Sequence, residues 1–239
     1  ISKLYASGNF NNIAYKISEL NENENLLTLN LQENKTKQSI RFGLHYDDLF
    51  KSGILLNYTK KRLLAKNDVA SLDLILGDNI RYNFDYYIDN GFYWSFGFNS
   101  KLTTFNRNIT SNIADDVVFN TTANAINVDF FDLSNQAYLQ TIFAQKFSLG
   151  GGLEFKFLRL ESETLENTKP VFEDSNYLSV FGFMKYDSFD KKYFSRTGWN
   201  FNSEIRYYGY SSDYKNNFER FTVAKADFGF AQPVFKNMT

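Results

Sequence analysis

Apolar and polar residues alternate strictly along residues 80–98, on both sides of the dipeptide Asn90-Gly91. The residues that share the apolar face are Ile80, Tyr82, Phe84, Tyr86, Ile88, Phe92, Trp94, Phe96 and Phe98. A period of two indicates β-strands, because successive side chains of a strand point to opposite sides. Asn-Gly accepts the positive φ that a two-residue type I′ turn needs. The pattern therefore predicts a β-hairpin with its turn at Asn90-Gly91.

The same period recurs from residue 37 almost to the end of the sequence and predicts about eleven strands. Besides residues 80–88, the predicted strands cover residues 40–46, 54–58, 70–76, 92–107, 121–131, 135–144, 153–157, 177–187, 199–207 and 224–230. Many of these strands are nearer ten residues than the five or six usual in soluble sheets. About ten residues, tilted by roughly 45°, are what a strand needs to cross a bilayer.

Short turns and long polar connections separate the predicted strands. Short turns are predicted at residues 78–79, 90–91 and 146–148, and long loops at residues 106–116, 161–174 and 209–217. Outer-membrane barrels have short periplasmic turns and longer extracellular loops. The alternation of lengths therefore fits a barrel whose two ends face different compartments.

The alternation alone allows two folds, because both have a period of two. A soluble β-sandwich or lipocalin-like barrel would hold the aromatic face inside, whereas a membrane barrel would turn it towards lipid. Strand length, aromatic residues near strand ends and mixed charges on the polar faces favour an antiparallel transmembrane β-barrel. The predicted lipid-facing residues are Phe84, Tyr86, Trp94, Phe96, Trp199 and Phe201. The predicted lumen-facing charges are Arg81, Asp85, Glu204 and Arg206.

Composition narrows the possible functions. The 239 residues include 26 basic and 27 acidic ones and no cysteine. A nucleic-acid partner is not expected, because it would need a basic stripe or domain. Without cysteine, disulfides, thiolate nucleophiles and cysteine-based metal sites are excluded. The mean hydropathy of −0.41 is compatible with a membrane barrel, whose strands alternate between lipid-facing and polar positions.

Catalytic motifs are missing from the sequence. There is no Gly-x-Ser-x-Gly elbow, and residues 150–152, three glycines, are expected to form a bent strand start or bulge. His45 is expected to make a lumen hydrogen bond rather than to act as a base. Asp187 and Asp190 could bind Ca²⁺, but a turn or strand-end role is favoured. We expect no enzyme activity, cofactor or metal in this span.

The first 35 residues follow a different pattern. Residues 1–8 resemble the last turn of a helix closed by a glycine. Residues 10–20 and 26–32 read as strands around the polar turn at residues 21–25. This order is that of the end of a small α+β module. We therefore divide the chain into residues 1–35, the end of that module, and residues 36–239, the barrel.

Two stretches resemble a known family. Residues 4–10 and 27–34 resemble the end of a POTRA module, with its small-Gly-x-Phe corner and Glu-Asn exit. Residues 187–199 are similar to the Asp…Phe-Pro-x-Arg/Lys-Gly signature of BamA-like outer-membrane barrels, with Ser195 in place of Pro. The resemblance implies that Arg196 reaches into the lumen and that Asp187 and Gly198 have structural roles. It also implies about 16 strands in the complete barrel, of which about eleven are predicted in this stretch.

A POTRA ending followed by residues 41–48 most resembles the C-terminal barrel of patatin-like phospholipase autotransporters (type V-d). The resemblance implies a bacterial outer-membrane barrel that anchors or exports an upstream lipid acyl hydrolase. Its partners would be the lipid bilayer and the POTRA and patatin domains of the same chain, with a homodimer as a further state. The alternatives are a BamA-like assembly or translocation factor and a soluble β-sandwich binding module. The translocating members carry an Arg-Gly-aromatic signature, which this sequence lacks.

Overall fold

The structure is a computed structural model that describes residues 10–21, 24–33, 37–110, 125–144, 146–162, 171–191, 194–212 and 216–233. The described strands are β1 (Phe10–Asn21), β2 (Glu24–Glu33), β3 (Gln38–Asp47), β4 (Lys51–Lys61), β5 (Asp68–Gly77), β6 (Arg81–Ile88), β7 (Ser95–Thr110), β8 (Ala125–Phe143), β9 (Phe147–Glu161), β10 (Val171–Asp187), β11 (Gly198–Ser211) and β12 (Phe221–Ala231). No helix in these ranges is long and apolar enough to cross a membrane.

The chain divides into two compact units, Ile1–Ser39 and Ile40–Thr239. In the first unit, β1 and β2 form an antiparallel hairpin in which Tyr15 pairs with Leu29 and Ile17 with Leu27. These two strands are the ones predicted at residues 10–20 and 26–32. The helix end predicted at residues 1–8 lies outside the described residues.

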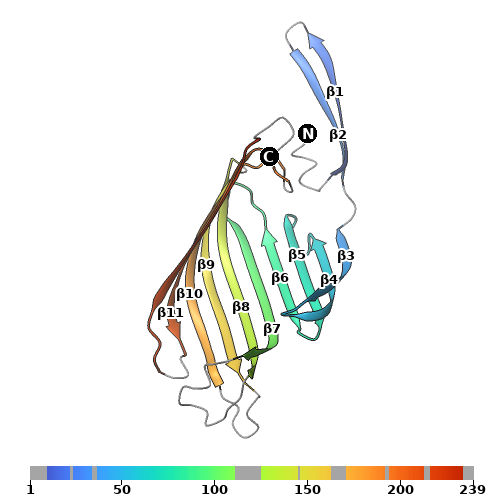
Figure 1. The fold of residues 1–239 in the computed structure, drawn as a ribbon. Coiled ribbons are helices and arrows are strands. Elements are labelled where there is room, and N and C mark those ends of the chain that lie inside the picture. The colour runs from blue at the N-terminus through green and yellow to red at the C-terminus, as the bar shows by residue number, and fades with distance from the viewer. Residues whose placement is uncertain are drawn as a thin grey trace. The chain divides into compact units, whose positions relative to one another are not determined.

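The second unit is built on one antiparallel sheet of ten strands, in the order β12-β11-β10-β9-β8-β7-β6-β5-β4-β3. Every strand lies beside its neighbours in sequence, so the sheet is a continuous meander (Figure 1). The antiparallel all-β prediction is confirmed. The sheet has two edges, β3 and β12, and is not closed on itself within the described residues.

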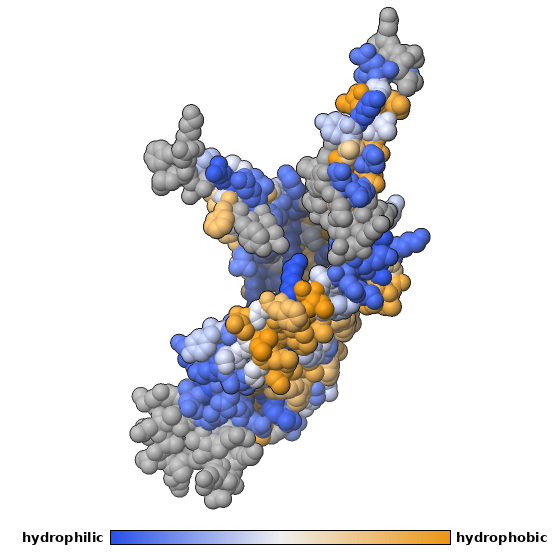
Figure 2. Space-filling view, turned by 90° about the vertical axis from the view of Figure 1, so that its right-hand side faces the viewer, coloured by the Kyte–Doolittle hydropathy of each residue, from blue (hydrophilic) through white to orange (hydrophobic). Residues whose placement is uncertain are grey.

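The strand register gathers the apolar residues on one face. Phe84 on β6 pairs with Leu72 on β5, and Leu72 pairs with Tyr58 on β4. Many large apolar side chains of this face are exposed; Leu44 on β3, for example, is 89% exposed. On the side seen in Figure 2, hydrophobic residues gather in one broad area that hydrophilic residues border. A β-sandwich would bury such a face against a second sheet, so the soluble sandwich interpretation is wrong.

The opposite face is polar but contains a line of rings set against glycines. Tyr138 on β8 pairs with Gly97 on β7 and with Gly152 on β9. Phe183 on β10 pairs with Gly150, and an added Cβ at Gly150 would lie 2.4 Å from the Phe183 ring. The register of β9 with both neighbours is unbroken across residues 150–152, and β9 begins at Phe147, so the predicted strand start or bulge at these glycines is wrong. The glycines leave space for these rings, because aromatic side chains commonly lie over glycines of a neighbouring strand.

Several strands are longer than the alternation suggested. Residues 121–131 and 135–144 were predicted as two strands, but residues 125–143 form the single strand β8, so the sheet has ten strands in the described residues and not about eleven. Polar Asp132 and Ser134 lie on the polar face and need no turn, because Leu133 between them pairs with Leu102 and Phe157 on the apolar face. β7, β8 and β10 have 16, 19 and 17 residues, more than the 9–11 that cross a bilayer.

The connection between β6 and β7 differs from the predicted two-residue turn. β6 ends at Ile88 and β7 begins at Ser95, and only Gly91 has a positive φ, of 63°. The buried hydroxyl of Ser95 accepts the Asn90 N–H at 2.8 Å, and the Asn90 side chain donates to the Trp94 carbonyl at 2.9 Å. These bonds hold a six-residue loop, so Trp94 lies in a connection and not in a strand.

The antiparallel order fixes which connections share an end of the sheet. The β7–β8, β9–β10 and β11–β12 connections, where the long loops were predicted, lie at one end. The short β5–β6 turn at residues 78–80 lies at that same end. The other end carries the β4–β5, β6–β7, β8–β9 and β10–β11 connections, and the last of these spans residues 188–197.

Candidate functional site

The polar face of β7 to β12 surrounds a cavity of about 250 Å³. The cavity is lined by Lys101, Thr103, Asp132, Ser134, Gln136, Glu154, Lys156, Glu204, Arg206, Tyr208, Val223 and Lys225. Side chains from β7 and from β12 meet around one space, which shows that the polar face is the concave one here. We call this set the polar wall.

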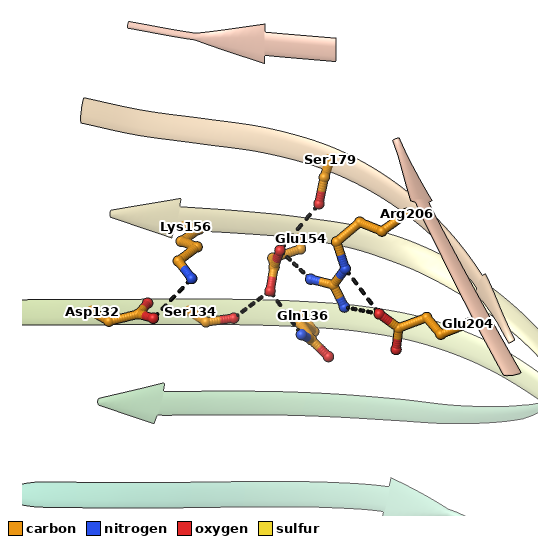
Figure 3. Close-up of polar contacts among 8 residues, drawn as sticks. All are labelled: Asp132, Ser134, Gln136, Glu154, Lys156, Ser179, Glu204 and Arg206. Atoms are coloured by element: carbon orange, nitrogen blue, oxygen red, sulfur yellow. Dashed lines mark hydrogen bonds and ion pairs between the residues drawn. The ribbon is translucent and has the colours of Figure 1, made fainter. Parts of the chain in front are cut away.

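Glu154 on β9 is the centre of the polar wall (Figure 3). It is only 3% exposed. Its carboxylate accepts hydrogen bonds from Ser134 at 2.7 Å, Gln136 at 2.8 Å and Ser179 at 3.1 Å. These donors come from β8 and β10, the strands on either side of β9, so the register itself places them around the carboxylate.

Arg206 on β11 completes the environment of Glu154. Its guanidinium forms an ion pair with Glu154, a bond of 2.9 Å with Glu204, and a cation–π contact with Phe181 at 4.9 Å. β9 and β11 are not neighbours, because β10 lies between them. The pair therefore bridges three strands across the concave face. A buried carboxylate is costly unless it is paired and hydrogen-bonded, and both conditions hold here.

Other polar groups continue this face on both sides. Lys156 pairs with Asp132 at 2.8 Å. Asp85 on β6 accepts a bond of 2.7 Å from Asn99 on β7, which also donates to Asn83. His45 is bonded to the Asp47 carboxylate, so the predicted hydrogen-bonding role of His45 has a partner.

Arg81 lies nearer the long-loop end of the same face. Its guanidinium stacks on the Phe50 ring at 3.6 Å. Nε and one Nη of Arg81 are buried and have no hydrogen-bond partner among the described residues. Arg81 thus lies against an aromatic ring, and the Asp47 carboxylate is the opposite charge that acts on it.

The β10–β11 connection, residues 188–197, is held by its own side chains. The Asp190 carboxylate accepts the N–H groups of Arg196 at 2.8 Å and Thr197 at 3.2 Å, and these bonds hold its pKa below the usual value for aspartate. Asp187 accepts the N–H of Phe189 at 2.9 Å. Gly198 has a φ of +120°, and an added Cβ would lie 2.5 Å from the Ser188 carbonyl oxygen. This position therefore requires glycine.

The sequence-predicted lumen residues fall into two groups. Arg81, Asp85, Glu204 and Arg206 share the polar face, as their strand positions show. Asp187, Arg196 and Gly198 lie at or in the β10–β11 connection. The Arg196 side chain is exposed, and no hydrogen bond or ion pair joins it to the polar wall in the described residues. Its reach into the lumen stays a prediction.

The sequence-predicted lipid-facing residues lie mostly on the apolar face. The register places Phe84, Tyr86 and Phe96 on that face of β6 and β7, and Trp199 and Phe201 on that face of β11. Trp199 packs edge-on against Phe228 and Phe230 with ring centroids 5.6 and 5.4 Å away. Contact of these residues with lipid stays a prediction.

Sequence reasoning missed the central role of Glu154. Its strand position was clear, because Leu153, Glu154, Phe155 and Lys156 alternate. The partner was not, because Arg206 lies two strands away and no local pattern joins the two residues. The one available signal was an acid two residues after the last of three glycines, so that Gly152, its neighbour on the same face of the strand, has no side chain to cover it.

The polar wall offers charges and hydrogen bonds but no reactive group in a catalytic arrangement. Within the described ranges, no three His, Cys, Asp or Glu side chains gather as metal ligands do. The Glu154 carboxylate, already satisfied by four partners, has no free position for a substrate. The arrangement can stabilise the sheet and line a water-filled interior.

Comparison with known proteins agrees with this architecture. The model of the OMP85 superfamily matches residues 25–239. The crystal structure of BamA from Haemophilus ducreyi lacking POTRA domains 1–3 is similar in fold, with a TM-score of 0.63 and 14% sequence identity. The similarity covers 99% of this chain and 45% of that one, so this chain spans less than half of that structure. No curated protein matches the chain.

Proposed function

Because the chain belongs to the OMP85 superfamily, we propose that it is part of an outer-membrane barrel that inserts other polypeptides into the membrane or moves them across it. The BamA-like resemblance found in the sequence is confirmed at the level of the superfamily. The observation that carries the proposal is the match of the family model over the whole ten-stranded sheet. The barrel of this family is not an enzyme, which agrees with the expectation of no catalysis in this span.

The two faces of the sheet support this role. The apolar face suits the bilayer, and the polar wall suits a hydrated interior through which a polar chain can pass. The bacterial outer membrane is the location that family and fold indicate. Residues 1–35 would then be the end of a POTRA module in the periplasm.

The test is an assembly assay with the full-length protein in liposomes. An unfolded outer-membrane barrel is added, and its folded, heat-resistant form is followed on gels. We expect the substrate to fold several times faster than in liposomes that contain an unrelated barrel at the same density. Equal rates in the two preparations would contradict the proposal.

A second candidate function is the anchoring or export of an upstream patatin-like phospholipase. The resemblance of the POTRA-like ending followed by residues 41–48 to the type V-d autotransporters favours it. The coding sequence upstream of Ile1 provides the test. A domain with a Gly-x-Ser-x-Gly elbow and phospholipase activity would support this candidate, whereas several successive POTRA modules would support assembly. The homodimer implied by the same resemblance is tested by the mass of the detergent-solubilised protein.

A further inference from the structure

The connection between β4 and β5, residues 62–67, combines positive charge with exposed leucines. The seven residues from 60 to 66 contain no acid and four cations, which are Lys60, Lys61, Arg62 and Lys66. Leu64 is 82% exposed, and Leu63 beside it is exposed as well. We infer that this connection, the basic turn, binds the headgroup of an anionic phospholipid in the leaflet that borders the short connections. The inference requires only that the barrel lies in a bilayer.

The basic turn is held in one conformation by Asp68. This residue is 2% exposed, and its carboxylate accepts the N–H groups of Leu63 at 2.7 Å, Leu64 at 2.7 Å and Ala65 at 2.8 Å. The hydroxyl of Tyr86 donates a fourth bond at 2.8 Å. The Asp68 carboxylate is therefore turned inwards and satisfied by the backbone of the turn and by Tyr86. The leucines are presented outwards by a fixed backbone.

The next connection at the same end enlarges the apolar surface. The Asn67 side chain donates to the side chain of Asn90 at 2.8 Å, and the Asp89 N–H donates to the Asn67 carbonyl at 3.0 Å. The β6–β7 connection that these bonds join to the basic turn exposes Phe92, Tyr93 and Trp94. The two leucines of the basic turn and the three aromatic residues of the β6–β7 connection are thus exposed on two joined connections, at the end of the apolar face of the sheet.

A phospholipid suits both parts of this surface. Lysine and arginine beside a membrane attract anionic headgroups, while leucine and aromatic side chains enter the boundary of the acyl region. Lys60 lies at the end of the apolar face, paired with Ala70, where a long side chain can reach the headgroup level. Lys66 is exposed and has no ion pair or hydrogen bond within the described part of the chain. A small soluble anion would use the cations but would leave Leu64 in water.

The first experiment counts bound phospholipid. The full-length protein is placed in nanodiscs of phosphatidylethanolamine and phosphatidylglycerol, released, and analysed by native mass spectrometry. We expect the wild type to retain phosphatidylglycerol preferentially, and Lys60→Gln/Lys66→Gln to retain about tenfold less. The control is Lys191→Gln/Arg196→Gln, which removes two exposed cations from the β10–β11 connection at the same end. Equal losses in the two double variants would overturn the inference, because any cation at this end would then serve.

The second experiment measures insertion of the leucines. The chain has no cysteine, so Leu64→Cys provides a single site for an environment-sensitive dye within it. We expect blue-shifted emission that brominated phospholipids quench in nanodiscs with phosphatidylglycerol. The same dye at Lys191→Cys should emit as in water. Water-like emission from position 64 in every lipid composition would overturn the inference, as would a blue shift that brominated lipids do not quench, which would indicate a protein partner.

Discussion

At the scale of single residues, the main feature is a fully paired carboxylate inside the sheet. Glu154 has four partners from three other strands, β8, β10 and β11, and Arg206 is shared between Glu154 and Glu204. A buried ion pair gives little net stability, but the loss of one partner leaves an uncompensated charge. The two residues should therefore behave as a unit.

We expect Arg206→Ala to lower the free energy of unfolding of the barrel by about 3–5 kcal/mol, because Glu154 stays buried and charged. The combined variant Glu154→Gln/Arg206→Met should recover much of this loss. Urea unfolding in detergent, followed by heat modifiability on gels, measures both. Lys156→Ala is the matched control, since Lys156 and Asp132 are more exposed, and its cost should be smaller. Additive losses in the double variant would show that the two charges do not depend on each other.

The Asp190 carboxylate should make the β10–β11 connection sensitive to acid. Its folded pKa lies below the ordinary value because Arg196 and Thr197 donate N–H groups to it. These bonds therefore stabilise the connection at neutral pH, and their contribution is lost as the pH falls through the lowered pKa. The amide resonances of Arg196 and Thr197 should shift with a midpoint below about 3.9, the reference value for aspartate. In Asp190→Asn this titration should be absent, and its persistence would assign it to another group.

At the scale of elements, β7 to β10 fit together through rings that lie over glycines. An added Cβ at Gly97 would lie 2.1 Å from Cζ of the Tyr138 ring, whereas one at Gly152 would lie 2.2 Å from the carbonyl oxygen of Ala137. The first obstacle is the end of a side chain and the second is backbone. Gly182, on the apolar face, has no atom nearer than 3.8 Å to its added Cβ.

These differences predict distinct outcomes for three alanine substitutions. Gly97→Ala should cost about 1–3 kcal/mol of stability, the usual range for overpacking, and Tyr138→Ala should relieve that cost in the double variant. Gly152→Ala should be costly in both backgrounds, because the backbone of Ala137 stays in place. Gly182→Ala should be close to neutral. The midpoint of urea unfolding measures all of them, and relief of Gly152→Ala by Tyr138→Ala would contradict the packing described.

At the scale of the whole sheet, one face is suited to lipid and the other to water. The register keeps this separation without a break in the pairing of β11 with β12 and of β8 with β9. A cation on the apolar face would therefore meet hydrocarbon, whereas a cation on the polar face would meet water and other charges.

We expect Ile205→Lys, on the apolar face of β11, to lower the stability of the barrel in bilayers by about 2–4 kcal/mol, the cost of a cation near mid-bilayer. Asn202→Lys, on the polar face of the same strand, should cost much less. Folding titrations in lipid vesicles with urea measure the difference. A similar cost at the two positions would show that the faces are not in different solvents.

The strands were predictable because the face of the sheet on which each residue lies follows from the local alternation of apolar and polar positions. The break between the two predicted halves of β8 was wrong because polar Asp132 and Ser134 suggested a turn, whereas both belong to the polar face. The length of the β6–β7 loop was missed because the hydroxyl of Ser95 holds it, and no dipeptide rule includes a residue five positions after Asn90.

The candidate site was only partly predictable. The register places Arg81, Asp85, Glu204 and Arg206 on one face, as the alternation predicts, and their position in a lumen stays a prediction. The pairing of Arg206 with Glu154 depends on the curvature of the sheet, which brings together strands that are not neighbours. Curvature is a property of the assembled sheet and leaves no mark in a short window of sequence.

The ion pair between Glu154 and Arg206 also has a consequence for the order of folding. Because β10 lies between their strands, the two side chains can meet only once β9, β10 and β11 are aligned and bent. A hairpin of any two of these strands lacks one of the two charges or the strand between them. The ion pair can therefore form only late in assembly, when the three strands are in the correct order. An intermediate with the wrong register would leave one of the two charges buried without its partner.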